Sequence, residues 1–320
     1  MKKAAKMIGL LLCVLALCIS SIYVLPNDWH DADCLFETND STFSIMTFNL
    51  DAGDSLHLLS DKQDRLIALI EREKPSILCL QELSFENHDK LKPFLEKTYG
   101  KCDSLSYADG KWRFLFYSRF PIRNFERLSC DEEMSTTGFD EKLLSEFEMR
   151  KKQMPVMSAE FEVMKSRWIR LFVGHLRSNA YSTARRQMDG DACWIEGIPQ
   201  YYRNYKNGKR IRDYEAKCIK GYVERAKSDG LSVIVAGDMN DWCGSDCLDM
   251  LMYGNGNSPE LKDAWKTCGR GWGFTYFGWH LRLTLDHILY SKNFELLDVK
   301  VIDTDISDHR PLMGLFKYKK

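Results

Sequence analysis

One short apolar run limits what this chain can fold into. Residues 231–236 include the consecutive branched residues Val233, Ile234 and Val235, and the run stops at Gly237-Asp238-Met239-Asn240. A short run of this kind is typical of a strand buried on both faces. A carboxylate and a carboxamide directly after such a strand place polar groups on a rigid element. Gly-Asp-x-Asn is also ordinary turn chemistry, so the run gains meaning only from similar strand ends elsewhere.

Several other apolar runs have the lengths of strands and helices. Strands are predicted over residues 43–50, 76–80, 111–118, 153–163, 168–176, 283–290, 294–301 and 312–318. Helices are predicted over residues 61–73, 90–99 and 211–228, with another helix before the last of these and a short one near 245–252. Strands alternate with helices early and pair as hairpins later. This order predicts an α/β fold with two mixed sheets packed face to face and helices outside.

Nine polar residues stand at or beside the ends of the predicted strands. They are Asn49, Asp51, Glu82, His175, Asp238, Asn240, Asp286, Asp308 and His309. Each alone has a structural interpretation, such as a turn cap or a satisfied core histidine. Hard oxygen ligands favour Mg²⁺ or Mn²⁺ over zinc. A divalent cation neutralises phosphate charge, a carboxylate orients water, and a His–Asp pair transfers protons or stabilises charge. Together the nine residues indicate phosphoester hydrolysis.

The composition fits one globular domain. The chain has 320 residues, of which 44% are hydrophobic and 28% charged, which is ample material for a core. The body contains no internal repeat, low-complexity tract or linker, so we expect a single domain over residues 42–320. Removing the three lysines of the N-terminus from the 45 basic residues leaves 42 against 46 acidic ones. That balance argues against a protein that coats nucleic acid by charge alone, but not against a local basic site.

The N-terminal segment predicts export. Lys2, Lys3 and Lys6 precede an uncharged run over residues 7–25. As a helix this run spans about 28 Å, close to the hydrocarbon thickness of a bilayer. The lysines should stay in the cytoplasm while the body crosses. The segment 1–25 suits an uncleaved anchor or a cleaved signal peptide, with its length slightly favouring the anchor, and residues 26–41 suit a tether. We expect a single-pass membrane protein, or a secreted one, with its domain outside the cytoplasm.

The eleven cysteines do not have the pattern of a disulfide framework. Two lie in the apolar N-terminal segment, which leaves an odd number, nine, in the body. Cys79, in a strand pattern, and Cys218, in a helical pattern, are expected to be buried free thiols. Cys243 and Cys247 are four residues apart, but no further ligands follow at zinc-site spacing. A local disulfide is favoured over zinc at that pair.

Six short blocks, in order, resemble the endonuclease/exonuclease/phosphatase superfamily. They are Thr47-Phe48-Asn49-Leu50, Gln81-Glu82, Gly174-His175-Leu176, Gly237-Asp238-Met239-Asn240, Leu285-Asp286-His287-Ile288 and Ser307-Asp308-His309-Arg310-Pro311. The resemblance covers residues 42–318, and the order of the blocks makes it specific. It implies the four-layered α/β sandwich shared by pancreatic-type deoxyribonuclease, neutral sphingomyelinases and inositol polyphosphate 5-phosphatases. It also implies a metal-dependent phosphoesterase.

The resemblance assigns a metal site, residue by residue. Glu82 is implied to be the principal ligand, with Asn49 and Asp51 beside it and Asp308 at the metal or its water. The implied cofactor is Mg²⁺, with Mn²⁺ as an alternative.

The same resemblance assigns the catalytic groups. Asp238 is implied to orient or deprotonate the attacking water, and Asn240 to help hold the water and the phosphate. His309, held by Asp286, is implied to contact the scissile phosphate. His175 matches the second histidine of the deoxyribonuclease and sphingomyelinase branches, and which histidine donates the proton stays open.

Substrate contacts are expected near these blocks. Arg177 and Asn179, which follow His175, are expected to bind substrate. Residues 179–211 form an insertion with interleaved aromatic and basic side chains, which suits nucleic-acid stacking or, as we favour, a helical insertion that packs its own aromatics. A second aromatic cluster over residues 272–279 suits a substrate lining and core packing equally.

The sequence therefore predicts an exported or membrane-anchored, Mg²⁺-dependent phosphodiesterase that acts as a monomer. A nuclease is the first choice. A phospholipid or sphingomyelin-type phosphodiesterase is close behind because of the location, and an inositol or sugar phosphatase follows. His175 and the exported topology argue against dedicated DNA repair, since abasic-site endonucleases lack this histidine. A catalytically silent scaffold is least favoured, because every acid, amide and histidine position is filled.

Overall fold

Two six-stranded mixed β-sheets form the centre of the molecule, which confirms the expected α/β sandwich. The computed structural model describes residue 13 and residues 35–52, 60–100, 103–106, 112–178, 194–253, 258–277 and 282–319. The first sheet has the strand order β11-β12-β1-β2-β4-β3. Its strands are β1 (Thr42–Ala52), β2 (Ile77–Ser84), β3 (Asp103–Ser106), β4 (Trp112–Ser118), β11 (Phe294–Val301) and β12 (Leu312–Tyr318).

The second sheet has the strand order β5-β6-β7-β8-β10-β9. Its strands are β5 (Ile122–Arg127), β6 (Val156–Met164), β7 (Arg167–His175), β8 (Ser232–Asp238), β9 (Leu261–Asp263) and β10 (Asp286–Ser291). Each sheet contains one parallel pair at its centre, β1 with β2 and β7 with β8. Because parallel neighbours need a crossover connection, a helix follows the first strand of each pair.

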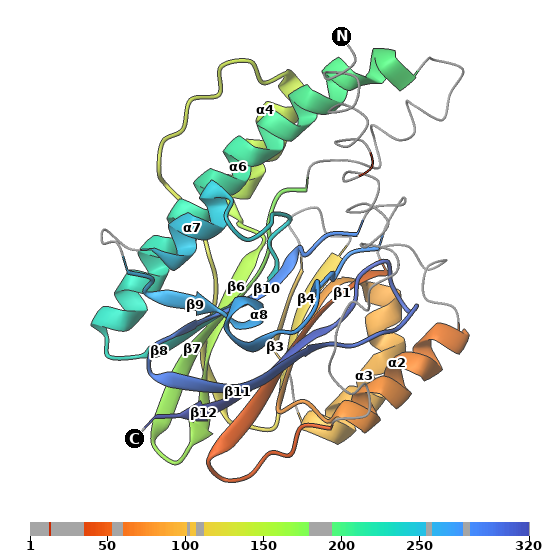
Figure 1. The fold of residues 1–320 in the computed structure, drawn as a ribbon, viewed down its shortest axis with the longest axis vertical. Helices are drawn as coiled ribbons and strands as arrows, with labels where there is room; N and C mark the ends of the chain where they lie inside the picture. Colours follow the sequence, from red (N-terminus) through yellow and green to blue (C-terminus); the bar gives the residue numbers. More distant parts are fainter. Residues whose placement is uncertain are drawn as a thin grey trace.

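Helices cover the outer faces of both sheets (Figure 1). They are α2 (Ser60–Glu73), α3 (Phe85–Tyr99), α4 (Glu141–Lys152), α6 (Trp194–Ser228) and α7 (Asp246–Met252), whereas the short helix α8 (Ala264–Cys268) packs against the apolar cluster between the sheets. Buried side chains of α2 and α3 pack with the first sheet, and those of α4, α6 and α7 pack with the second. A third cluster, containing Phe43, Phe161 and Ile234, fills the space between the sheets. Three apolar layers therefore hold four layers of secondary structure together.

Helix α6 differs from the expectation of two helices before β8. It is one helix of 35 residues. Its apolar stripe begins at Ile211, where the helix packs on the second sheet. The part before Ile211 contains glycine and proline, which lower helix propensity, so the sequence reveals only the packed half. Strands β3, β5 and β9 and helix α8 were also absent from the expectation, because they are short or, in β5, largely exposed.

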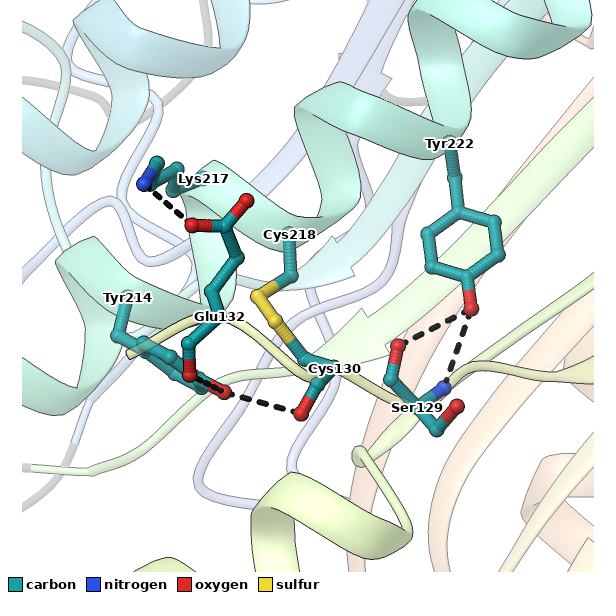
Figure 2. Close-up of a disulfide and its surroundings, with 7 residues drawn as sticks. All are labelled: Ser129, Cys130, Glu132, Tyr214, Lys217, Cys218 and Tyr222. Atoms are coloured by element: carbon teal, nitrogen blue, oxygen red, sulfur yellow. Dashed lines mark hydrogen bonds and ion pairs between the residues drawn. A yellow bond between two sulfur atoms is a disulfide. The ribbon is translucent and has the colours of Figure 1, made fainter. Parts of the chain in front are cut away.

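Cys218 is not the free thiol that its helical pattern suggested, because it forms a disulfide with Cys130 (Figure 2). Tyr214 and Tyr222 of α6 donate hydrogen bonds to the carbonyl oxygens of Cys130 and Ser129 on either side of the crosslink. The bond ties the loop after β5 to α6. Two cysteines 88 residues apart meet only in the folded chain, so helical periodicity could not identify the pair. Cys243 and Cys247 are both free, so the favoured local disulfide is also wrong.

The expected membrane segment, residues 7–25, lies outside the described residues except for Cys13. Among the residues that the structure describes, no helix is long and apolar enough to cross a bilayer.

Candidate active site

Strand ends from both sheets meet at one edge of the sandwich. The parallel pair β1 and β2 brings Asn49 and Glu82 to the same end of the first sheet. In the second sheet, Asp238 at the end of β8 pairs with His175 of β7 and with Asp286 at the start of β10. These polar residues are buried, apart from His175, whose side chain is 12% exposed, and they face one another across the two sheets.

The backbone is distorted where it delivers two of these groups. Glu82 has φ 54°, an uncommon value for a residue with a side chain, and lies where the register of β2 with β4 shifts between Leu80 and Leu83. A bulge of this kind turns a side chain toward a site that a regular strand would miss. Gly237, before Asp238, has φ 126°, and a Cβ there would lie 2.0 Å from the carbonyl oxygen of Gly174. Only glycine fits this approach of β7 to β8.

Asn49 links the carboxylates of the two sheets. Its amide nitrogen donates to Glu82 Oε1 at 3.0 Å and to Asp238 Oδ2 at 3.1 Å. His175 Nε2 lies 3.2 Å from Glu82 Oε1 and 3.6 Å from Asp238 Oδ2. The backbone N–H of Asn240 donates to Asp238 Oδ1 at 2.8 Å, which fixes the other oxygen of that carboxylate.

His309 approaches the same cluster from the loop before β12. Its Nδ1 lies 2.7 Å from Asp286 Oδ2, and its Nε2 lies 3.6 Å from Asp238 Oδ2. The Tyr276 ring packs against the imidazole with a centroid separation of 5.1 Å. Thr275 accepts the backbone N–H of Asp286 through its hydroxyl oxygen. No specific role could be predicted for Tyr276, because nothing in an aromatic-rich segment distinguishes the ring that touches the histidine.

The two histidines have opposite electrostatic environments. Burial lowers the pKa of His175 to about 4, despite the opposing effect of Asp238. Burial also acts to lower the pKa of His309, but Asp286 and Asp238 outweigh it and raise the pKa to about 10. At neutral pH His175 is therefore neutral and His309 is an imidazolium. Such a divergence between neighbouring groups separates acid from base roles in active sites.

The acidic groups fit a divalent cation. Burial raises the pKa of Glu82 to about 8, and the nearby Asp51 and Asp238 carboxylates add to this effect, while the hydrogen bond from Asn49 and the charge of His309 act against it. Burial likewise raises the pKa of Asp238. Asp286 Oδ1 is buried and has no hydrogen-bond partner among the described residues. A buried, carboxylate-rich donor set of this kind suits a hard cation that prefers oxygen ligands.

The predicted metal ligands Asn49, Asp51 and Asp308 differ in how they lie relative to Glu82. Asn49 presents its amide nitrogen to Glu82, while its oxygen accepts the backbone N–H of Asp51. Its oxygen would face a cation at Glu82 only if the amide turned over. Asp51 lies close enough to raise the pKa of Glu82. Asp308 Oδ1 accepts a hydrogen bond from the Ser307 hydroxyl, beside His309.

The predicted substrate-binding residues and Asn240 have other contacts. Arg177 Nε lies 2.8 Å from Glu146 of α4, and the Arg177 backbone N–H donates to Glu215 of α6. The guanidinium is thus held outside the hydrogen-bonded cluster of Glu82, Asp238 and the histidines. The Asn240 amide nitrogen donates to the Leu176 carbonyl, so the side chain ties the turn after β8 to the residue that follows β7. Asn179 lies outside the described residues.

Comparisons with known proteins show the family and the fold. The Endonuclease/Exonuclease/phosphatase family profile matches residues 46–309. The human Nocturnin catalytic domain with bound sulfate is 16% identical over 89% of this chain and 96% of that one, with a TM-score of 0.60. Danio rerio TDP2 complexed with a single-strand DNA product is 17% identical over 87% and 100%, with a TM-score of 0.59. A Bacteroides vulgatus protein of the family is 16% identical over 87% and 100%, with a TM-score of 0.59. No curated protein sequence matches the chain.

The fold and the site define an α/β sandwich with a buried acidic centre at the edge of two sheets. The family match covers most of the chain, so this protein belongs to the endonuclease/exonuclease/phosphatase family. The assignment supports a hydrolase acting on phosphoester bonds and confirms the resemblance of the six sequence blocks.

Proposed function

We propose that this protein is a Mg²⁺-dependent phosphodiesterase and that nucleic acid is its substrate. One observation carries the proposal: the cationic His309, anchored to Asp286, lies beside the buried carboxylates of Asp238 and Glu82. A fixed cation and a buried carboxylate, held a short distance apart, can bind a phosphate and orient the water that attacks it.

Glu82 would hold the cation, with Asn49, Asp51 and Asp308 near it. When bound, Mg²⁺ supplies charge neutralisation and polarises the phosphoryl oxygens. Mn²⁺ is expected to substitute, because it accepts the same oxygen ligands.

The remaining residues have roles set by their protonation. Asp238 Oδ2 lies between the two imidazoles and can accept a proton from water, while the N–H of Asn240 holds the other oxygen in place. His309 carries the proton and can donate a hydrogen bond to a phosphoryl oxygen as charge develops there. His175 is neutral, and its Nε2 lies 3.2 Å from Glu82 Oε1, where it can help to position that carboxylate. We therefore assign the proton donor to His309.

Two exposed tryptophans, each parallel to a second aromatic ring and close in sequence to site residues, favour nucleic acid over a small phosphomonoester. Trp242, two residues after Asn240, is 44% exposed and lies parallel to Tyr205 of α6. Trp272 is 41% exposed and lies parallel to Phe274, two residues before Tyr276. Flat exposed rings of this kind can stack on bases without sequence preference. The TDP2 structure with a single-strand DNA product shows that this fold can present such a product.

We also propose that the folded domain works outside the cytoplasm, as a monomer. The Cys130–Cys218 disulfide supports this location, because disulfides persist mainly in oxidising compartments. The positively charged N-terminus and the apolar run that follows supply the export signal or anchor.

Substrate class is tested by two assays on the full-length chain with Mg²⁺. We expect nicking of supercoiled plasmid and no release of soluble headgroup from sphingomyelin or phosphatidylcholine vesicles. Trp242→Ala should lower kcat/KM on DNA by about tenfold, the loss of one stacking contact, and leave bis(p-nitrophenyl) phosphate turnover unchanged. Trp168→Ala is the matched control. Trp168 lies at the start of β7, at the opposite end of that strand from His175, and packs on Arg123 of β5. Headgroup release without nicking would replace the nuclease with the lipid phosphodiesterase.

A further inference from the structure

A second cluster of metal-ligating side chains lies beside the proposed catalytic centre. Cys243 follows β8, Asp263 ends β9, and His287 is the second residue of β10. One ligand atom from each lies within 4.8 Å of the other two. Because successive side chains of a strand point to opposite faces, His287 points away from the cluster that Asp286 joins. The two sites therefore share strand β10 but have no residue in common.

The His287 ring is oriented as a ligand would be. Its Nε2 lies 3.0 Å from the carbonyl oxygen of Asp241, and a carbonyl only accepts, so Nε2 carries a hydrogen. Its Nδ1 then faces Asp263 Oδ2 at 2.8 Å. Metal-binding histidines commonly donate their other ring N–H to a backbone carbonyl or carboxylate, which fixes the ring. Here the Asp241 carbonyl does this and leaves Nδ1 for a ligand bond.

The carboxylate and the thiol are also positioned. Asp263 is buried, and its Oδ1 is fixed by the backbone N–H of Lys266, which leaves Oδ2 directed at the imidazole. The Cys243 sulfur lies within 4.8 Å of the ligand atoms of Asp263 and His287, and the residue is only half-buried, so a cation can enter from its side. The Lys266 ammonium also contacts the sulfur, but this side chain is exposed and free to rotate into solvent.

We propose that Cys243, Asp263 and His287 form a second metal site that takes a zinc-class divalent cation. A thiolate, an imidazole and a carboxylate with one open position are the ligand set of a four-coordinate Zn²⁺ site, whereas Mg²⁺ prefers oxygen ligands alone. Binding displaces the thiol proton and the Nδ1 proton, and the cation takes their place between the three side chains. A cation at this site would link the loop after Asn240, through Cys243, to β9 and β10. We therefore propose that the metal holds that loop in position.

The proposal is tested by metal binding rather than by turnover, so the result does not depend on whether the proposed function is correct. The full-length chain, freed of metal, is titrated with Co²⁺ and then with Zn²⁺ against a chelator. We expect a thiolate-to-cobalt charge-transfer band at one equivalent, and its loss on addition of Zn²⁺. Cys243→Ser should abolish the band, and Asp263→Asn, which keeps a cap for α8, should weaken Zn²⁺ binding by at least about tenfold.

Two controls separate this site from other ligands. Cys268→Ser removes another half-buried free thiol and should leave the band unchanged. Glu82→Ala disables the proposed catalytic metal site and should also leave it unchanged. Circular dichroism of each variant verifies folding. A wild-type chain without the band, a band that survives Cys243→Ser, or one lost in Glu82→Ala would each overturn the proposal.

Discussion

At the scale of single residues, the proton of His309 is the feature on which the chemistry depends. The two imidazoles lie at the same distance, 3.6 Å, from one oxygen of Asp238. His309 also has the carboxylate of Asp286 2.7 Å from its other ring nitrogen, Nδ1. A raised pKa for a histidine means that the folded state favours the cation. The stabilisation is complete below the unfolded pKa, near 6.5, and is lost as the pH rises through about 10.

This pairing makes a prediction for the pH dependence of activity. The protonated form of His309 is the active one, so kcat/KM on bis(p-nitrophenyl) phosphate should fall only as the pH approaches 10. Asp286→Asn removes the carboxylate, so the alkaline limb should move to lower pH and kcat/KM at pH 8 should fall by about 10²–10³. The measurement is the pH profile of kcat/KM for both proteins.

Asp229→Asn is the matched control, since Asp229 is exposed at the end of α6 and should reproduce the wild-type profile. An Asp286→Asn enzyme with the wild-type alkaline limb would show that Asp286 does not hold the His309 proton.

At the scale of elements, the pair β7–β8 delivers both His175 and Asp238, and its geometry depends on a glycine. Gly237→Ala would place a Cβ against the Gly174 carbonyl in a backbone conformation that alanine resists. We expect a loss of at least about 2 kcal/mol in the free energy of unfolding, with loss of activity. Gly221→Ala, in the open middle of α6, should be neutral or stabilising by up to about 1 kcal/mol. Urea denaturation of the two variants measures the difference, and equal stabilities would contradict the close approach.

The disulfide links two elements that the fold otherwise joins by hydrogen bonds. It closes a loop across 88 residues, so removing it frees much of the unfolded chain. Changing both Cys130 and Cys218 to Ser should lower the free energy of unfolding by about 2–4 kcal/mol. Dithiothreitol should lower the Tm of the wild type and leave that of the double variant unchanged. Labelling of both thiols in the untreated wild type would show that the bond is not formed in the protein.

At the scale of the whole molecule, more of the active site than of the surrounding fold could be predicted from the sequence. Residues such as Glu82, Asp238 and His309 lie at or beside the ends of apolar strands. Residues at the ends of neighbouring strands lie together at one edge of a sheet. Their identity as one cluster was therefore predictable from order and local pattern. The bulge at Glu82 was not predictable, because the sequence of a strand that carries a carboxylate does not reveal whether its register with the next strand shifts.

The features that escaped prediction depend on contacts between distant segments. Cys130 meets Cys218, and Cys243 meets His287, only after β5, α6 and β10 have packed, and no local spacing encodes either meeting. Arg177 shows the converse. Its place after His175 suggested a substrate contact, but α4 brings Glu146 to its guanidinium. Tertiary packing decides the partner of a long charged side chain, so its neighbours in sequence are a weak guide.

The central claim is that a metal-dependent phosphodiesterase centre is built around Glu82. The most direct measurement is bis(p-nitrophenyl) phosphate turnover by the full-length chain, with Mg²⁺ and with the metal chelated, for the wild type, Glu82→Gln and Glu71→Gln. Glu71 is an exposed glutamate on α2 and serves as the matched control. We predict turnover that requires Mg²⁺, falls by at least about 10² in Glu82→Gln and is unchanged in Glu71→Gln. Turnover that persists without metal, or that survives intact in Glu82→Gln, would contradict the claim.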